Sequence, residues 1–326
     1  MILTSAPAKI ILFGEHFVVE DRLALAAAIN LRAKIKADFN DSKYFSITSD
    51  FFPTTLNINV DDITYHRFSP IGDFFKPLLF ILHDFSKNFE LNRGIDFIIE
   101  SEIPVGMGLG SSAAVSVAFT AALFKLMNYP FTLKDIISFA SKGEYIAHGR
   151  PSGIDPTIST IGGIILYSRS CGFNTLDIKL NEPILIGITG EVRSTVEMVD
   201  KVLKLKNKYP YIFKLIYEAN DMIVREAINA MKIKDYIRLG ELMNIAHGLL
   251  SSLGVSNLNL ERLIYAVRKA GAYGAKLTGA GGGGAMIALC NSDSIDHVVK
   301  AIGESGGRVL YSNISYEGVK IHEKYS

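Results

Sequence analysis

Two carboxylates and one lysine stand out as residues that could do chemistry. Glu144 falls late in a predicted helix, and Asp155 follows eleven residues later in a predicted loop. Phosphoryl transfer needs one carboxylate to hold Mg²⁺ and another near the acceptor hydroxyl. Taken singly, each has an ordinary alternative: Glu144 could lie on a solvated helix face, and Asp155-Pro156 is a common turn signal.

Lys9 interrupts the apolar strand 8–13, and Glu15 and His16 follow at the end of that strand. A buried lysine requires a partner, because an isolated buried charge is costly. Polar side chains at a strand end can reach into a cleft. The alternative for Lys9 is a solvent-facing strand position, and a lone histidine is more often structural than functional.

The segment PVGMGLGSSAA at 104–114 lies between a predicted strand and a predicted helix. Its glycines can adopt positive φ and let backbone N–H groups approach an anion. The helix that follows adds unpaired N–H groups and the positive end of its dipole, so the segment could cradle a phosphate. Ser111 or Ser112 could cap this helix, and a serine hydroxyl there could ligate Mg²⁺. The alternative is a tight turn without a ligand; the spacing is neither a P-loop nor a dinucleotide fingerprint.

A second glycine cluster, GAGGGG at 279–284, lies between two strand-like segments. Consecutive glycines cost backbone entropy on folding, and an ordinary turn rarely needs so many. The cluster predicts a close approach of the backbone to substrate or to another part of the chain.

The elements that must position these residues alternate between strands and helices. Hydrophobic periodicity predicts strands over 2–13, 24–38, 95–103, 164–168, 184–189 and 285–289, with mixed strands and loops over 39–70. Predicted helices span 72–88, 113–127, 132–146, 195–206, 210–230, 234–250 and 259–270, with Thr132 as an N-cap.

Composition limits the function classes. The chain has 326 residues, 48% hydrophobic residues and a net charge of +1, so neither nucleic acid nor an anionic membrane is favoured as a partner. Cys171 and Cys290 are far apart and suggest no disulfide framework. The sequence shows no signal peptide and no run of about 20 apolar residues, which fits a reducing cytoplasm. We expect two domains, residues 1–175 and 176–326, with a junction in 170–183.

Taken together, the motifs resemble the GHMP kinases, the family named for galactokinase, homoserine kinase, mevalonate kinase and phosphomevalonate kinase. The resemblance covers Ser5 to Leu289 and rests on three blocks in the family's order, PAKIILFGEH at 7–16, PVGMGLGSSAA at 104–114 and KLTGAGGGG at 276–284. Within the family, the mevalonate kinases are most similar. That likeness rests on HGRPSGIDPTISTIGG at 148–163, EVRSTVEMV at 191–199 and MNIAHGLLSSLGVS at 243–256.

The resemblance implies a two-lobed α+β fold. The N-terminal lobe would be similar to ribosomal protein S5 domain 2, and the C-terminal lobe to a ferredoxin-like α/β sandwich. It also implies ATP-dependent phosphorylation of mevalonate with Mg²⁺, and it is compatible with a homodimer. Another GHMP kinase acting on homoserine or a sugar, a mevalonate diphosphate decarboxylase-like lyase and a catalytically silent ligand sensor are the alternatives.

The resemblance assigns roles by position. Asp155 and Lys9 match the catalytic pair, and Ser112 and Glu144 match the Mg²⁺ ligands. Glu15, His16, Arg193, Gly281 and Gly282 match the substrate side, with Arg193 suited to a carboxylate because a guanidinium binds it bidentately. Residues expected around ATP are Pro104, Gly106, Met107, Gly108, Leu109, Gly110, Ser111, Ser112 and Ala113. Two departures concern loop shape: Met107 replaces a smaller residue, and Pro156 stands where Asn is common.

Overall fold

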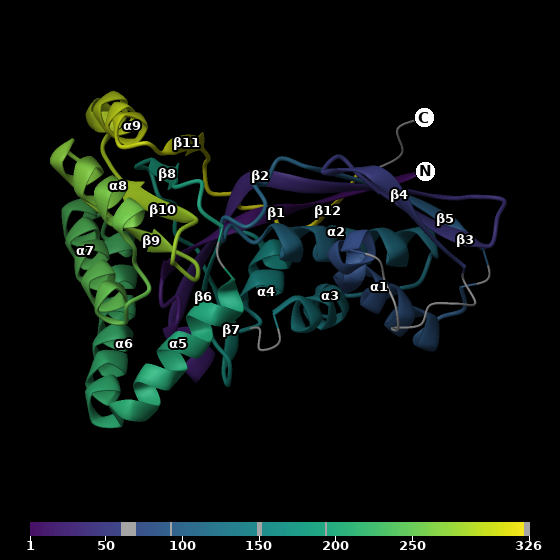
Figure 1. The fold of residues 1–326 in the computed structure, drawn as a ribbon, viewed down its shortest axis with the longest axis horizontal. Helices are drawn as coiled ribbons and strands as arrows, with labels where there is room; N and C mark the ends of the chain where they lie inside the picture. The colour runs from purple at the N-terminus through teal and green to yellow at the C-terminus, as the bar shows by residue number, and fades with distance from the viewer. Residues whose placement is uncertain (60–69, 92, 149–151, 193, 323–326) are drawn as a thin grey trace.

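The computed structural model describes residues 1–59, 70–91, 93–148, 152–192 and 194–322; side chains are not described at 52–54, 70–74 and 146–148. Helices and sheets are mixed along the chain, which confirms the α+β fold class. Figure 1 shows an elongated molecule with one sheet toward each end and helices packed against both.

The first sheet is built on the long antiparallel pair β1 and β2 and has the order β12-β1-β2-β5-β3-β4. Strand β6 pairs with β2, and β7 pairs with β6. Its strands are β1 (Ile2–Phe13), β2 (Ala24–Phe39), β3 (Tyr44–Ser49), β4 (Phe52–Asn59), β5 (Ile95–Ser101), β6 (Ile164–Ser168), β7 (Gly172–Leu176) and β12 (Lys320–His322).

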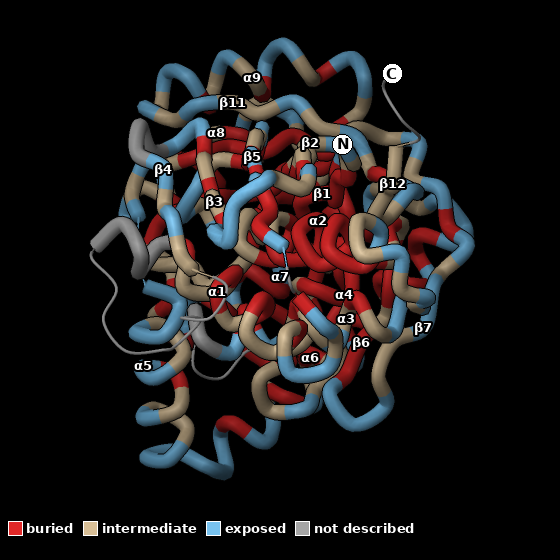
Figure 2. The backbone as a smooth tube through the Cα atoms, turned by 90° about the vertical axis from the view of Figure 1, so that its right-hand side faces the viewer, coloured by how far each residue is buried: buried red, intermediate tan, exposed pale blue. Residues whose placement is uncertain are grey.

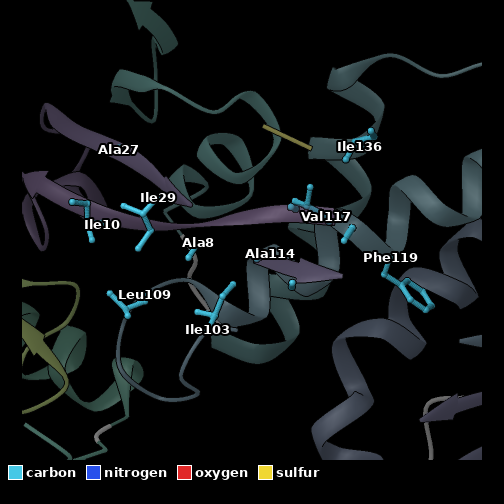
Figure 3. Close-up of a cluster of buried hydrophobic side chains, with 14 of the residues drawn as sticks. Ala8, Ile10, Ala27, Ile29, Ile103, Leu109, Ala114, Val117, Phe119 and Ile136 are labelled. Carbon is cyan, nitrogen blue, oxygen red and sulfur yellow. The ribbon is translucent and has the colours of Figure 1, made fainter. Parts of the chain in front are cut away.

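Four helices cover one face of this sheet in Figure 1: α1 (Pro70–Asn88), α2 (Ser111–Leu126), α3 (Leu133–His148) and α4 (Ile154–Ile161). Small and apolar residues cover nearly all sides of α2, which predicts a fully buried helix. It does lie at the centre, as the red tube in Figure 2 shows. Figure 3 shows Ala8 and Ile10 of β1 in the buried cluster with Ala114 and Val117 of α2. The start of α2 is therefore held rigidly under β1.

The second sheet is antiparallel, with the order β11-β8-β10-β9. Helices α6 to α9 lie at its end of the molecule in Figure 1. The elements are β8 (Ile184–Ile188), α5 (Thr195–Lys208), α6 (Pro210–Lys232), α7 (Tyr236–Ser252), α8 (Leu258–Lys269), β9 (Gly274–Thr278), β10 (Ala285–Leu289), α9 (Ile295–Glu304) and β11 (Arg308–Tyr311).

The chain returns to the first sheet at its C-terminal end. Strand β12 pairs with β1. The Ser315 backbone N–H donates to the Ala28 carbonyl, and the Ser315 carbonyl accepts from the Gly163 N–H. The sheets change between β7 and β8, close to the expected junction at 175/176, but β12 belongs to the N-terminal sheet. One hydrophobic cluster also contains residues of both sheets, such as Ile35 and Ile186. The two lobes therefore contribute side chains to one continuous hydrophobic core.

None of the helices in the described ranges is both long enough and apolar enough to span a membrane.

Helix α7 packs on β9 through two glycines. A Cβ on Gly240 would lie 2.3 Å from the backbone carbon of Tyr273, and one on Gly274 would lie 2.0 Å from the Gly240 carbonyl oxygen. This approach brings α7 against the strand that carries Lys276.

We predict that Gly240→Ala lowers the free energy of unfolding by about 1–3 kcal/mol, because the added methyl group overpacks the α7–β9 contact. Gly248→Ala in the same helix is the matched control. Apart from its chain neighbours and the adjacent backbone of α7, no described atom lies within 4 Å of the position that its added Cβ would occupy. The free energy of unfolding of this variant should therefore rise by about 0.5–1 kcal/mol. Denaturant unfolding measures both, and equal effects at the two positions would contradict the close packing.

Candidate active site

The segment before α2 forms a glycine-rich loop between β5 and the helix, as its sequence predicts. Gly106, Gly108 and Gly110 have φ of 74°, 75° and 76°, a region that L side chains rarely adopt. The expected cap is corrected: Gly110 is the N-cap, and Ser111 and Ser112 are the first helical residues. The described residues supply no side-chain cap. The first N–H groups of α2 thus remain suited to an anion.

This loop opens into a cavity of about 950 Å³. Residues from both parts of the chain line it, including the strand end at Glu15 and His16, the start of α5 and the second glycine cluster. The predicted residues that line it are Lys9, Glu15, His16, Pro104, Gly106, Gly108, Leu109, Gly110, Ser111, Ser112, Ala113, Glu144 and Asp155.

Lys9 lies against the loop and beside Asp155. The Lys9 Nζ is 3.1 Å from Asp155 Oδ2, and the two side chains are 6% and 27% exposed. A Cβ on Gly110 would lie 2.8 Å from Lys9 Cγ, and the Lys9 N–H donates to the Leu109 carbonyl. Lys9 thus faces the cavity instead of solvent, and only glycine at 110 leaves room for its stem.

Asp155 lies in a helix, which corrects the predicted loop. Helix α4 begins at Ile154 after Gly153, whose φ is 87°. Pro156 is in the first helical turn, where its missing N–H has no intrahelical partner to lose. The proline is therefore compatible with the first turn of the helix that carries Asp155.

Ser112 and Glu144 face the same cavity from α2 and α3. The two helices pack together: a Cβ on Gly143 would lie 3.2 Å from Ser116 Oγ, one turn after Ser112. A hydroxyl and one carboxylate are hard oxygen donors. They fit Mg²⁺, which is usually held by one or two carboxylates together with substrate phosphates and water. Within the described residues no group of three His, Cys, Asp or Glu forms a metal cage, so a metal here would depend on the phosphates.

Glu15 is held by a residue that the sequence analysis did not single out. Its Oε1 pairs with Nζ of Lys276 on β9, and both side chains are almost fully buried. Burial raises the pKa of Glu15 and lowers that of Lys276, while each charge opposes the shift of the other. A lysine inside the apolar strand 274–278 was the available signal, the same one that identified Lys9.

His16 is buried at the cavity wall. Its Nε2 is 2.8 Å from the Ala280 carbonyl oxygen, so Nε2 carries the proton. Burial lowers the pKa of His16, although the bond to Ala280 opposes this. The ring is therefore neutral near pH 7, with Nδ1 left as an acceptor.

The second glycine cluster approaches another part of the chain, the first glycine loop. A Cβ on Gly279 would lie 3.1 Å from the Gly108 carbonyl oxygen, and one on Gly284 would lie 3.0 Å from that of Met107. Gly279 and Ala280 line the cavity.

Three predicted contact residues are not among the described residues that line the cavity. The Met107 side chain packs against the hydrophobic core. Gly281 and Gly282 instead meet the Val255 carbonyl, to which the Gly282 N–H donates at 2.6 Å. Arg193 lies outside the described residues.

Two further parts of the wall were not predicted. One is the start of α5, with Ser194, Thr195 and Val196. The other is a set of apolar residues that line the same cavity: Phe51, Phe75, Ile99, Val105 and Val115. Such residues carry no motif, since any core or surface position can be apolar.

Comparisons with known proteins identify the family. The family model of the GHMP kinases N terminal domain matches residues 77–163, and that of the GHMP kinases C terminal matches residues 224–308. A mevalonate kinase of Thermococcus sibiricus is 40% identical over 99% of this chain and 98% of its own length.

Two solved structures have the same architecture. The Methanococcus jannaschii mevalonate kinase is 28% identical with a TM-score of 0.84, over 96% of this chain and 98% of that one. The L. major mevalonate kinase in complex with R-mevalonate is 29% identical with a TM-score of 0.78, over 95% and 94%. Fold, site and sequence all agree that this chain belongs to the GHMP kinase family.

Proposed function

We propose that this chain is a mevalonate kinase, which transfers the γ-phosphoryl group of ATP to the C5 hydroxyl of mevalonate. The observation that carries the proposal is the contact between Lys9 and Asp155 at the mouth of α2, 3.1 Å between charged atoms, in one cavity with the glycine loop. The acceptor is inferred from the relatives, which are named mevalonate kinases at 40% identity over nearly the whole chain.

The loop and the start of α2 would bind the ATP phosphates. Positive-φ glycines turn successive N–H groups toward one point, and the helix dipole adds positive potential there. Gly106 to Ala113 supply these groups. The apolar residues around Phe51 and Phe75 line the same cavity and would offer a surface for the nucleobase.

Asp155 and Lys9 would act on the acceptor. Asp155 accepts the proton of the attacking hydroxyl as the new O–P bond forms and the bond from the γ-phosphorus to the β,γ-bridging oxygen breaks, so that ADP leaves. Lys9 favours the ionised oxygens beside it, because opposite charges a few ångströms apart stabilise each other. Its fixed position also requires no reorganisation during transfer.

Ser112 and Glu144 would hold Mg²⁺. When bound, the ion offsets charge on the β- and γ-phosphates. On the acceptor side, His16 Nδ1 can accept a hydrogen bond from a substrate hydroxyl, and Glu15 lies beside it. A role for Arg193 with the carboxylate, a cytoplasmic location and a homodimer remain predictions.

We predict that Asp155→Asn lowers the turnover rate with mevalonate and Mg-ATP by about 10²–10⁴-fold, because the amide cannot accept the hydroxyl proton. A coupled ADP-release assay measures turnover, and fluorescence titration should show nearly unchanged ATP affinity. Asp177→Asn, at an exposed position, is the control and should keep wild-type turnover. An Asp155→Asn variant within a few-fold of wild type would contradict the catalytic role.

The wild-type chain should phosphorylate mevalonate in preference to galactose, homoserine and phosphomevalonate. Mass spectrometry of the products identifies the acceptor directly. If a sugar or homoserine were turned over faster, that compound and not mevalonate would be the substrate. CO₂ release from mevalonate diphosphate would indicate a lyase.

We also expect Glu144→Gln to raise the Mg²⁺ concentration for half-maximal activity about tenfold or more, because an amide oxygen is a weaker ligand than a carboxylate. Glu218→Gln on the exposed side of α6 is the control. An unchanged Mg²⁺ requirement in Glu144→Gln would remove Glu144 from the metal site.

A further inference from the structure

One wall of the cavity is supplied by the segment that leads into α5. Ser194, Thr195 and Val196 line the cavity, and the Ser194 hydroxyl accepts the Glu197 N–H as the N-cap of the helix. Val192 contacts the glycine loop 104–110, called here the phosphate loop because we propose that it binds the ATP phosphates. A Cβ on Gly106 would be 2.8 Å from Val192 Cγ1. The placement of this wall therefore sets the width of the site.

The wall is fixed by the residue that precedes it. Asn257 Nδ2 donates to Glu191 Oε2 at 2.5 Å, and Asn259 Nδ2 donates to Glu191 Oε1 at 2.9 Å. The backbone of Glu191 is held as well, because its carbonyl accepts the Gly284 N–H at 2.8 Å. Hydrogen bonds to a charged acceptor are stronger than neutral ones, so both carboxylate oxygens are well satisfied.

The segment 254–259, a loop that ends in the first two residues of α8, supplies the two asparagines and has further anchors. Lys201 Nζ of α5 donates to the Gly254 carbonyl at 2.5 Å. Asn257 also donates to the Gly282 carbonyl at 3.1 Å, and its Oδ1 caps α8. The loop thus ties α5, the second glycine cluster and α8 to one another.

None of these three polar residues is among the described residues that line the cavity. Glu191, Asn257 and Asn259 therefore act through the wall instead of touching a substrate. We infer that they form a positioning unit, called here the Glu191 clamp, that holds the start of α5 against the phosphate loop and so sets the affinity for the acceptor. This inference rests on the proposed function.

Asn259→Asp tests the clamp with a nearly isosteric change. It places a second carboxylate about 3 Å from Glu191, and like charges at that distance repel. We expect the KM for mevalonate to rise about tenfold, typical for coupling within one hydrogen-bond network, with kcat changed by less than threefold. Hydrogen exchange of the amides in 194–200 should become faster.

A charge swap provides the rescue. In Glu191→Gln/Asn259→Asp, the new amide at position 191 can donate to the new carboxylate at position 259 while its oxygen accepts from Asn257, so donors and acceptors match again. We expect KM within about twofold of wild type and slow exchange restored. Asn229→Asp, exposed on α6, is the control for adding a negative charge and should behave as wild type.

The outcomes separate the possibilities. A rise in KM that the swap does not reverse, or an Asn259→Asp variant with wild-type KM and exchange, would overturn the clamp. Lower thermal stability in Asn259→Asp without a change in KM would reduce it to a structural contact and also overturn the inference. If wild type does not turn over mevalonate, the proposed function fails, whereas the exchange measurements still test the clamp by themselves.

Discussion

The site depends on a close contact between two glycine segments. Gly108 and Gly279 meet backbone to backbone, as do Met107 and Gly284. A side chain at Gly279 or Gly284 would lie about 3 Å from a carbonyl oxygen and would also require a positive φ of 79° or 73°. Without this contact the two sheets would stand further apart, and the phosphate loop, the strand end at Glu15 and the start of α5 would not share one cavity.

The charged pairs of the site join elements that come together only when the chain folds. Lys9 and Asp155 come from β1 and α4, and Glu15 and Lys276 from the end of β1 and from β9. Glu15 and Lys276 are almost fully buried, and removing a single partner from such a pair typically costs about 3–5 kcal/mol. The Asp155 side chain is 27% exposed, so solvent screens its pair with Lys9. Each pair forms only when its two elements have assembled. The ion pairs of the site are therefore complete only in the folded chain.

The sequence predicted most helices and strands, because hydrophobic periodicity is local. The convergence of Lys9, Asp155 and the start of α2 was predicted through the resemblance to the GHMP kinases. It failed where a local signal has two meanings. Pro156 and Gly153 were interpreted as a loop, yet the same residues suit the first turn of a helix. Lys276 interrupts an apolar strand as Lys9 does and was overlooked; its pairing with Glu15, 261 positions away, could not be predicted from either segment alone. The short strand β12 has too few residues for any period to be recognised.

In the proposed mechanism, the residues assigned to phosphoryl transfer and the α5 wall come from different parts of the fold, although Glu15 and His16 on the acceptor side follow the end of β1. The loop, Lys9 and Asp155 belong to the first sheet and its helices. The wall at α5 belongs to the second half of the chain and is fixed by Glu191 and the segment 254–259. Because Val192 touches the phosphate loop at Gly106, a shift of the wall would change the space for an acceptor while the Lys9–Asp155 contact stays intact. This separation offers a physical reason why one fold can keep a single transfer chemistry and accept different alcohols.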